Sequence, residues 1–182
     1  MIAICRHGET KYNTEGRYQG QSDSPLTEKG VYQARLLGRR LAQLGVQEIY
    51  ASPLSRVRTT LEIALPICDH RLLYPPYYLS ELMEIYFGDY EGKLKSEVPP
   101  DILHQRVSNK AYHKFPNGES YYDLADRVNF AVNKIKDLAY SNNIAILAHE
   151  GVNRVLYYLA NPQIGFTRAL EMKQPNGVIW LL

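Results

Sequence analysis

Near its N-terminus the chain reads Ile2-Ala3-Ile4-Cys5-Arg6-His7-Gly8-Glu9-Thr10, changing abruptly from apolar residues to charged residues and glycine. An apolar run that stops at a loop in this way is typical of a buried strand. Gly8 allows the backbone a tight turn where a side chain would clash. Open α/β sheets bind ligands at the carboxyl ends of their strands, so we expect Arg6 and His7 at a ligand site. Taken alone, the pair also fits an ordinary solvated strand end, and the assignment therefore depends on the rest of the chain.

The same pattern occurs again near the other end of the chain. A turn at Asn142-Asn143 leads into the apolar run Ile144-Ala145-Ile146-Leu147-Ala148, which is followed by His149-Glu150-Gly151. If the two strands are neighbours in a parallel sheet, their histidines lie side by side at one edge of that sheet. Residues 48–51 and 178–182 are also expected to form strands.

Helices are expected between the strands. One begins after Thr27, whose side chain is placed to cap free backbone amides, and ends at Gly45. A second has Pro53 and Arg56 in its first turn, and others cover 119–140 and 152–159. The expected buried stripes are Val31, Ala34, Leu37, Leu41 and Leu44 in the first helix, and Leu124, Val128, Ala131, Ile135 and Leu138 in the helix over 119–140. This alternation predicts a three-layer α/β/α fold with a mostly parallel central sheet.

Two segments lack a regular pattern. Residues 11–24 are polar and contain glycine, and we expect an ordered loop there. Residues 66–118 are rich in proline and tyrosine and are expected to be irregular, because prolines at 75, 76, 99 and 100 interrupt any long helix. An irregular stretch of this length usually carries a lid or substrate loop, here about 75–118. Its aromatic side chains fit a satellite core equally well.

The bulk properties fit one ordinary globular domain over residues 1–182, with 45% hydrophobic and 22% charged residues. A net charge of +2 is too small to suggest a nucleic-acid partner. No apolar run approaches the roughly 20 residues that a membrane helix needs. The two cysteines, Cys5 and Cys68, are too few for a disulfide framework, and the first strand leaves no room for a signal peptide. We therefore expect a cytoplasmic protein.

The candidate site combines two histidines with two arginines, Arg6 and Arg56. Fixed guanidinium charges repel a metal ion, so we expect no metal and no cofactor at His7 and His149. The same charges suit a dianion, because the planar guanidinium fork matches the oxygens of a phosphate group.

These residues carry a family resemblance that extends over nearly the whole chain. The run RHGETxxN from Arg6 to Asn13 resembles the signature of the histidine phosphatase superfamily, the phosphoglycerate mutase-like proteins. The likeness continues, in the family's order, through Gln19-Gly20, Asp23-x-Pro25-Leu26-Thr27, SPLSR at 52–56, ExxxGxxEG at 84–92, PNGES at 116–120 and AHEG at 148–151.

The resemblance implies a role for each matching residue. His7 is the nucleophile that forms a phosphohistidine, and Glu84 protonates the leaving oxygen and then activates water. Arg6, Arg56 and His149 line the phosphate pocket, which Asn13, Gln19 and Gly20 close. Glu81 competes for the role of Glu84, which we favour on the family's spacing. Attack by an imidazole requires a neutral ring, and neighbouring arginines favour that form.

Two departures from the family pattern bear on function. His149-Glu150-Gly151 stands where the family commonly has His-Gly-Gly or His-Gly-Asn, and we expect Glu150 to point away from the pocket, since its charge opposes a phosphate. The insert over residues 92–116 is short, which predicts a small lid and an open pocket. The segment Gly88-Asp89-Tyr90-Glu91-Gly92 also resembles sequences of the phosphatase branch more than those of the mutase branch.

The sequence thus predicts a metal-independent phosphoric monoester hydrolase that acts on small phosphorylated metabolites. Phosphosugars, 3-phosphoglycerate, phosphoserine and ribazole phosphate all fit, and nothing supports a phosphoprotein substrate. A phosphoglycerate mutase is the nearest alternative, although a short lid shields a phosphohistidine poorly from water. A non-catalytic phosphate-binding member of the family is a third. The sequence carries no signal of oligomeric state.

Overall fold

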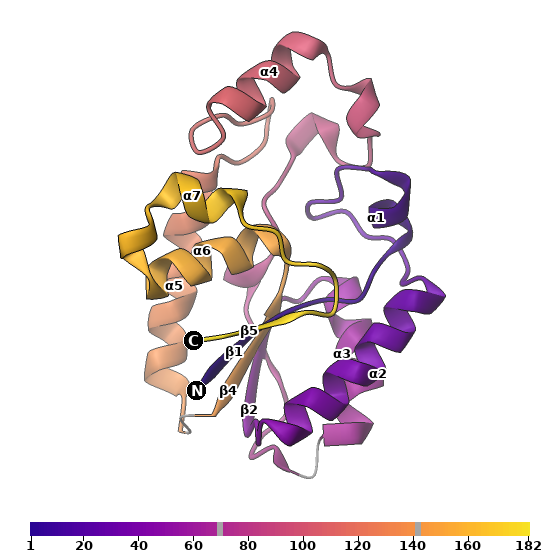
Figure 1. The fold of residues 1–182 in the computed structure, drawn as a ribbon, viewed down its shortest axis with the longest axis vertical. Helices are drawn as coiled ribbons and strands as arrows, with labels where there is room; N and C mark the ends of the chain where they lie inside the picture. The colour runs from indigo at the N-terminus through magenta and orange to yellow at the C-terminus, as the bar shows by residue number, and fades with distance from the viewer. Residues whose placement is uncertain (69–70, 141–142) are drawn as a thin grey trace.

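A five-stranded sheet forms the centre of the molecule (Figure 1). The computed structural model describes residues 1–68, 71–140 and 143–182. The strands are β1 (Ile2–Arg6), β2 (Glu48–Ala51), β3 (Tyr77–Tyr78), β4 (Ile144–Ala148) and β5 (Ile179–Leu181), in the spatial order β3-β2-β4-β1-β5. Only β5 is antiparallel to its neighbour, β1, so the prediction of a mostly parallel sheet is confirmed.

Helices cover both faces of this sheet (Figure 1). On one face α2 (Glu28–Gln43) packs against α3 (Ser55–Cys68). On the other lie α5 (Tyr121–Leu138) and α6 (Glu150–Ala160), with α7 (Phe166–Glu171) beside α6. The expected three-layer α/β/α fold is therefore confirmed.

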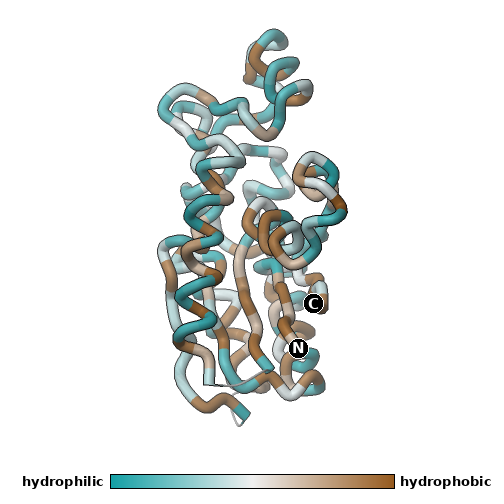
Figure 2. The backbone as a smooth tube through the Cα atoms, turned by 90° about the vertical axis from the view of Figure 1, so that its left-hand side faces the viewer, coloured by the Kyte–Doolittle hydropathy of each residue, from teal (hydrophilic) through white to brown (hydrophobic). Residues whose placement is uncertain are grey.

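Alternate residues of each strand supply the two cores. Ala3 and Cys5 pack into the cluster under α2 and α3, whereas Ile4 packs into the cluster under α5 and α6. Every residue of β4 is buried, as expected of a parallel strand that is covered on both faces. Figure 2 shows these apolar strands running between helices that carry hydrophilic segments.

Within the described residues, three α-helices form where the sequence predicts none, namely α1 (Lys11–Glu15), α4 (Pro100–Ser108) and α7. Helix α1 replaces the first part of the expected loop over 11–24, because Thr10 and Asn13 cap each other's backbone amides reciprocally. Helix α4 begins at Pro100, a first-turn position where the missing N–H costs no hydrogen bond. It lies at the end of the molecule toward which β1 runs (Figure 1).

Other boundaries also differ from expectation. Helix α3 begins at Ser55, so Pro53 precedes the helix instead of lying in its first turn. The helix continues through Pro66 to the buried Cys68, although proline removes one backbone hydrogen bond. Leu138, expected on the buried stripe of α5, is 40% exposed at the end of that helix. Asn142, half of the predicted turn, lies outside the described residues.

One close backbone contact positions the loop after β1. A Cβ atom on Gly8 would lie 2.5 Å from the carbonyl oxygen of Gly30 in α2. Only glycine lets the loop and the helix approach so closely, which confirms the clash expected from the sequence. Within the described ranges, no helix combines the length and apolar character required to cross a membrane.

Candidate active site

The two predicted histidines meet at the carboxyl ends of adjacent strands. Strands β1 and β4 pair with Arg6 opposite Ala148, and the backbone N–H of His7 donates to the carbonyl of Ala148 at 3.2 Å. The ring centroids of His7 and His149 are 5.2 Å apart. The prediction that the two imidazoles lie side by side is therefore confirmed.

The hydrogen bond of His7 fixes which of its nitrogen atoms can react. Nδ1 lies 2.7 Å from the carbonyl oxygen of Gly8, which only accepts hydrogen bonds, so Nδ1 carries the proton. Nε2 then keeps its lone pair. Burial, together with the positive charges of Arg56 and Arg6, holds the pKa of His7 well below its usual range. His7 is therefore a neutral imidazole with a free nucleophilic nitrogen.

His149 lies behind the cavity and orients Arg56. The Nε–H of Arg56 donates to Nδ1 of His149 at 3.2 Å. Nδ1 is therefore an acceptor, and the neutral ring carries its proton on Nε2, which lies 2.8 Å from Ser52 Oγ. Burial, followed by the charge of Arg56, keeps the pKa of His149 well below its usual range. His149 is fully buried and does not line the cavity, in contrast to its expected place in the wall.

Arg56 is itself held by the loop that follows α1. Its Nη1 donates to the carbonyl of Ser22 at 2.9 Å and to Asp23 Oδ1 at 3.0 Å, and its Nη2 donates to the carbonyl of Gly20. These bonds fix the guanidinium group near His7. Because the guanidinium group is already in position, little free energy is spent on reorganisation when an anion binds.

Glu150 enters the cavity instead of pointing away, so that expectation is wrong. Its carboxylate lies 3.3 Å from Arg6 Nη1 and 3.0 Å from Arg154 Nη2, and it also accepts the backbone N–H of Gln174. The arginines on either side balance its charge. Arg6 also donates to the carbonyl of Gln174, and its buried Nε has no partner among the described residues.

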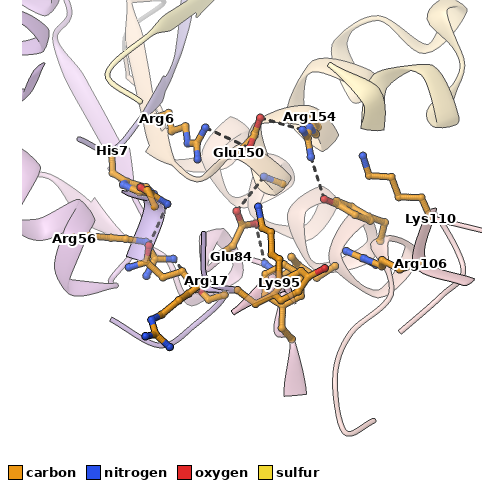
Figure 3. A pocket seen from close by; sticks show the side chains of 18 residues that line it. Arg6, His7, Arg17, Arg56, Glu84, Lys95, Arg106, Lys110, Glu150 and Arg154 are labelled. Carbon is orange, nitrogen blue, oxygen red and sulfur yellow. Dashed lines mark hydrogen bonds and ion pairs between the residues drawn. The ribbon is translucent and has the colours of Figure 1, made fainter. Parts of the chain in front are cut away.

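A cavity of about 360 Å³ contains most of the predicted residues. Its wall includes His7, Arg6, Arg56 and Glu84, whereas Glu81 is paired with Lys134 outside it. Figure 3 shows His7 and Arg56 on one side of this cavity and Arg106, Lys110 and Arg154 on the far side. Glu84 and Glu150 lie between these two groups.

Glu84 is positioned by two backbone amides. Its Oε2 accepts from Gly151 N, near the start of α6, at 3.1 Å, and its Oε1 accepts from Ile85 N at 2.9 Å. A carboxyl held in this way lies inside the cavity that contains His7, where a general acid must be.

Asn13, Gln19 and Gly20 also line the cavity, as expected from the sequence. Gln19 is buried and accepts from Thr10 Oγ1 at 2.8 Å, and Asn13 accepts from Asn176 Nδ2 at 3.2 Å. Asn176 was not predicted; it also donates to the carbonyl of His7 and so joins the C-terminal segment to the His7 loop.

Most of the basic residues in the cavity wall were not predicted from the sequence. These unpredicted residues are Arg17, Lys95, Arg106, Lys110 and Arg154. Arg154 carried a usable signal, because it follows Glu150 by one helical turn in α6. The others lie in segments for which no regular structure was expected. Across the three described ranges, no group of three or more His, Cys, Asp or Glu side chains could hold a metal ion.

The chain is similar to a known protein family over almost its whole length. The family model described as "Histidine phosphatase superfamily (branch 1)" matches residues 2–182. The chain belongs to this superfamily. Its relatives in the superfamily include "Probable phosphoglycerate mutase GpmB" of Escherichia coli, 36% identical over 152 residues, which cover 82% of this chain and 69% of that protein.

Solved structures of the superfamily have the same fold. The alpha-ribazole phosphatase from Shigella flexneri matches with a TM-score of 0.81 and 27% identity, over 98% of this chain and 87% of that one. YhfR of Bacillus stearothermophilus matches with a TM-score of 0.84 and 32% identity, over 98% and 88% of the two chains. These likenesses confirm the phosphoglycerate mutase-like fold.

Proposed function

We propose that this member of the histidine phosphatase superfamily is a phosphomonoesterase that acts through a phosphohistidine on His7. The observation that carries the proposal is the state of His7, a neutral imidazole whose free Nε2 lies in a cavity walled by Arg6 and Arg56. Charge on a transferring phosphoryl group spreads over its oxygens, so fixed cations beside a nucleophile are the main catalytic requirement.

Two displacements complete the reaction. Nε2 of His7 attacks phosphorus while the bond to the leaving oxygen breaks, and the Glu84 carboxyl gives its proton to that oxygen. The Glu84 carboxylate then removes a proton from a water molecule as it attacks the phosphohistidine. Inorganic phosphate leaves, and His7 and Glu84 return to their starting states. No step requires a metal ion, and we propose metal-independent catalysis.

Small phosphorylated metabolites are the proposed substrates. The cavity volume of about 360 Å³ suits a small ligand. Its wall includes the exposed Lys95, so its mouth opens to solvent and water can reach a phosphohistidine. The names of two relatives, an alpha-ribazole phosphatase of solved structure and a probable phosphoglycerate mutase, suggest the chemical range to be screened. Cys5 is a buried free thiol and Cys68 is also buried, which fits the cytoplasmic location that we propose.

A panel of phosphoesters tests this function. Phosphosugars, 3-phosphoglycerate, phosphoserine and ribazole phosphate are incubated with the protein, and inorganic phosphate is measured with His7→Ala as the blank. We expect phosphate release that the variant lacks. A folded protein that binds phosphate but hydrolyses no member of the panel would overturn the proposal in favour of a non-catalytic role.

A mutase is the second candidate, favoured by the 36% identity to the probable phosphoglycerate mutase of Escherichia coli. The same incubation with 3-phosphoglycerate distinguishes the two activities. A phosphatase releases inorganic phosphate, whereas a mutase primed with 2,3-bisphosphoglycerate forms 2-phosphoglycerate and leaves the total of esterified phosphate unchanged.

A further inference from the structure

The far side of the cavity carries positive charge that a single phosphate at His7 does not use. Seven basic side chains line the cavity, against the two carboxylates of Glu84 and Glu150. A phosphate group brings about two negative charges at neutral pH, and it meets Arg6 and Arg56 beside His7. Of the remaining basic residues, Arg106 lies in α4 and Arg154 in α6. Arg17, Lys95 and Lys110 lie in segments outside the α-helices.

Three of these cations, Arg106, Lys110 and Arg154, lie on the side of the cavity away from His7 (Figure 3). All three lie around Tyr121. Arg154 Nη1 donates to the Tyr121 hydroxyl at 3.3 Å. The Arg106 guanidinium carbon lies 5.0 Å from the centre of the Tyr121 ring, and Lys110 Nζ lies 5.9 Å from it. The three cations therefore surround one aromatic side chain at one end of the cavity.

These cations are short of negative partners. Throughout the described part of the chain, neither Arg106 nor Lys110 forms an ion pair, and Arg154 shares Glu150 with Arg6. Arg106 is only 8% exposed, and its charge is met by aromatic rings and by the carbonyl of His113. Lys110 donates to the carbonyl of Leu170.

The crowding of positive charge affects Lys110 directly. Burial, reinforced by Arg154 and Arg106, lowers the pKa of Lys110 to about 8, against the weaker opposing effect of Glu150 and Glu171. An anion bound among these side chains would offset the repulsion. Such charge-assisted bonds are the strong ones in proteins, and Tyr121 offers a hydroxyl beside them.

We propose that Arg106, Lys110 and Arg154 form a second anion subsite, which binds a carboxylate or a second phosphate of the ester whose first phosphate lies at His7. The inference rests on the proposed function and narrows its substrate class to phosphomonoesters with a second acidic group. Glu150 lies between the two subsites and bridges them, because its carboxylate pairs with Arg6 on one side and with Arg154 on the other.

Matched esters test the subsite. Bisphosphates of straight-chain diols, and the corresponding ω-carboxyalkyl phosphates, are compared with ω-hydroxyalkyl monophosphates of the same chain length. We expect kcat/KM for the doubly acidic ester to exceed that of its hydroxyl partner by about tenfold or more at the best length, mainly through KM. The carboxylate and phosphate series show which acidic group is preferred. Equal values at every chain length would overturn the proposal.

Variants then locate the effect. Lys110→Gln should bring this ratio toward one, whereas Lys110→Arg should preserve it. Lys114→Gln is the control, because it removes the same charge from an exposed side chain that does not line the cavity. An equal loss of the ratio in both Gln variants would show a general charge effect and refute the subsite.

Hydrolysis of 4-nitrophenyl phosphate, with His7→Ala as the blank, reports the proposed function separately. If that activity is absent, titration calorimetry of the bisphosphates and monophosphates still decides the question of the subsite. A Kd ratio of about tenfold that is lost in Lys110→Gln supports the subsite, and a ratio of one in the wild-type protein overturns it.

Discussion

Replacing Gly151 with alanine tests whether Glu84 is the proton donor without altering Glu84 itself. A Cβ atom at position 151 would lie 2.3 Å from Glu84 Oε1, whereas ordinary contacts begin at 3.4 Å. The carboxyl group must therefore move by about 1 Å, and it is the free end of a flexible side chain. A displacement of this size at a reacting group typically costs about 10²-fold in rate.

The loss should depend on the leaving group. An alkyl alcohol needs a proton as it departs, whereas 4-nitrophenolate departs without one, so Gly151→Ala should slow alkyl phosphates by about 10²-fold and 4-nitrophenyl phosphate much less. The free energy of unfolding should change by no more than about 1 kcal/mol, because alanine is the better helix former in α6. Steady-state kinetics and denaturant unfolding measure the two effects.

A double-mutant cycle identifies the cause. If Gly151→Ala acts only by moving the carboxyl group, it should add little to Glu84→Gln, and the double variant should resemble Glu84→Gln alone. Multiplicative losses, or an unchanged rate on alkyl phosphates in folded Gly151→Ala, would refute the role of Glu84.

Three further predictions concern the cavity beside His7. His7→Ala should abolish turnover of every phosphoester, and substantial residual activity would exclude His7 as the nucleophile. Treatment with EDTA should leave kcat/KM unchanged, and a loss restored by divalent cations would refute metal-independent catalysis. The lowered pKa values of His7 and His149 imply that neither ring titrates in NMR spectra as the pH falls through 6.5. The unfolded chain does bind protons there, so the free energy of unfolding should decrease below about pH 6.5 and fall less steeply in His7→Asn, and an equal slope would contradict the assignment.

The sheet and the residues beside His7 could be predicted from the sequence because their signals are local. Apolar runs before Arg6-His7-Gly8 and His149-Glu150-Gly151 mark two buried strands and the point where each ends. The cap at Thr27 was equally readable, since its side chain accepts from Gly30 N. Such signals depend on a few adjacent residues, so they can be recognised without knowledge of the tertiary structure.

The far side of the cavity could not be predicted, because it depends on contacts between distant segments. Arg106 reaches the cavity because α4 docks on Phe87, Phe115 and Tyr121, and no local pattern announces that packing. The orientation of Glu150 was predicted wrongly for the same reason: its partner Arg154 is one helical turn away, but Arg6 comes from another strand. These two arginines balance the charge of Glu150 that would otherwise oppose a phosphate.

The most direct test of the account is to trap the phosphorylated enzyme. The protein is mixed rapidly with 4-nitrophenyl phosphate and quenched under alkaline conditions, which preserve phosphohistidine, and its peptides are analysed by mass spectrometry. We predict one added phosphoryl group on His7, on Nε2, and none in His7→Ala. Turnover with no phosphorylated peptide at any quench time, or with the phosphoryl group on another residue, would contradict the mechanism.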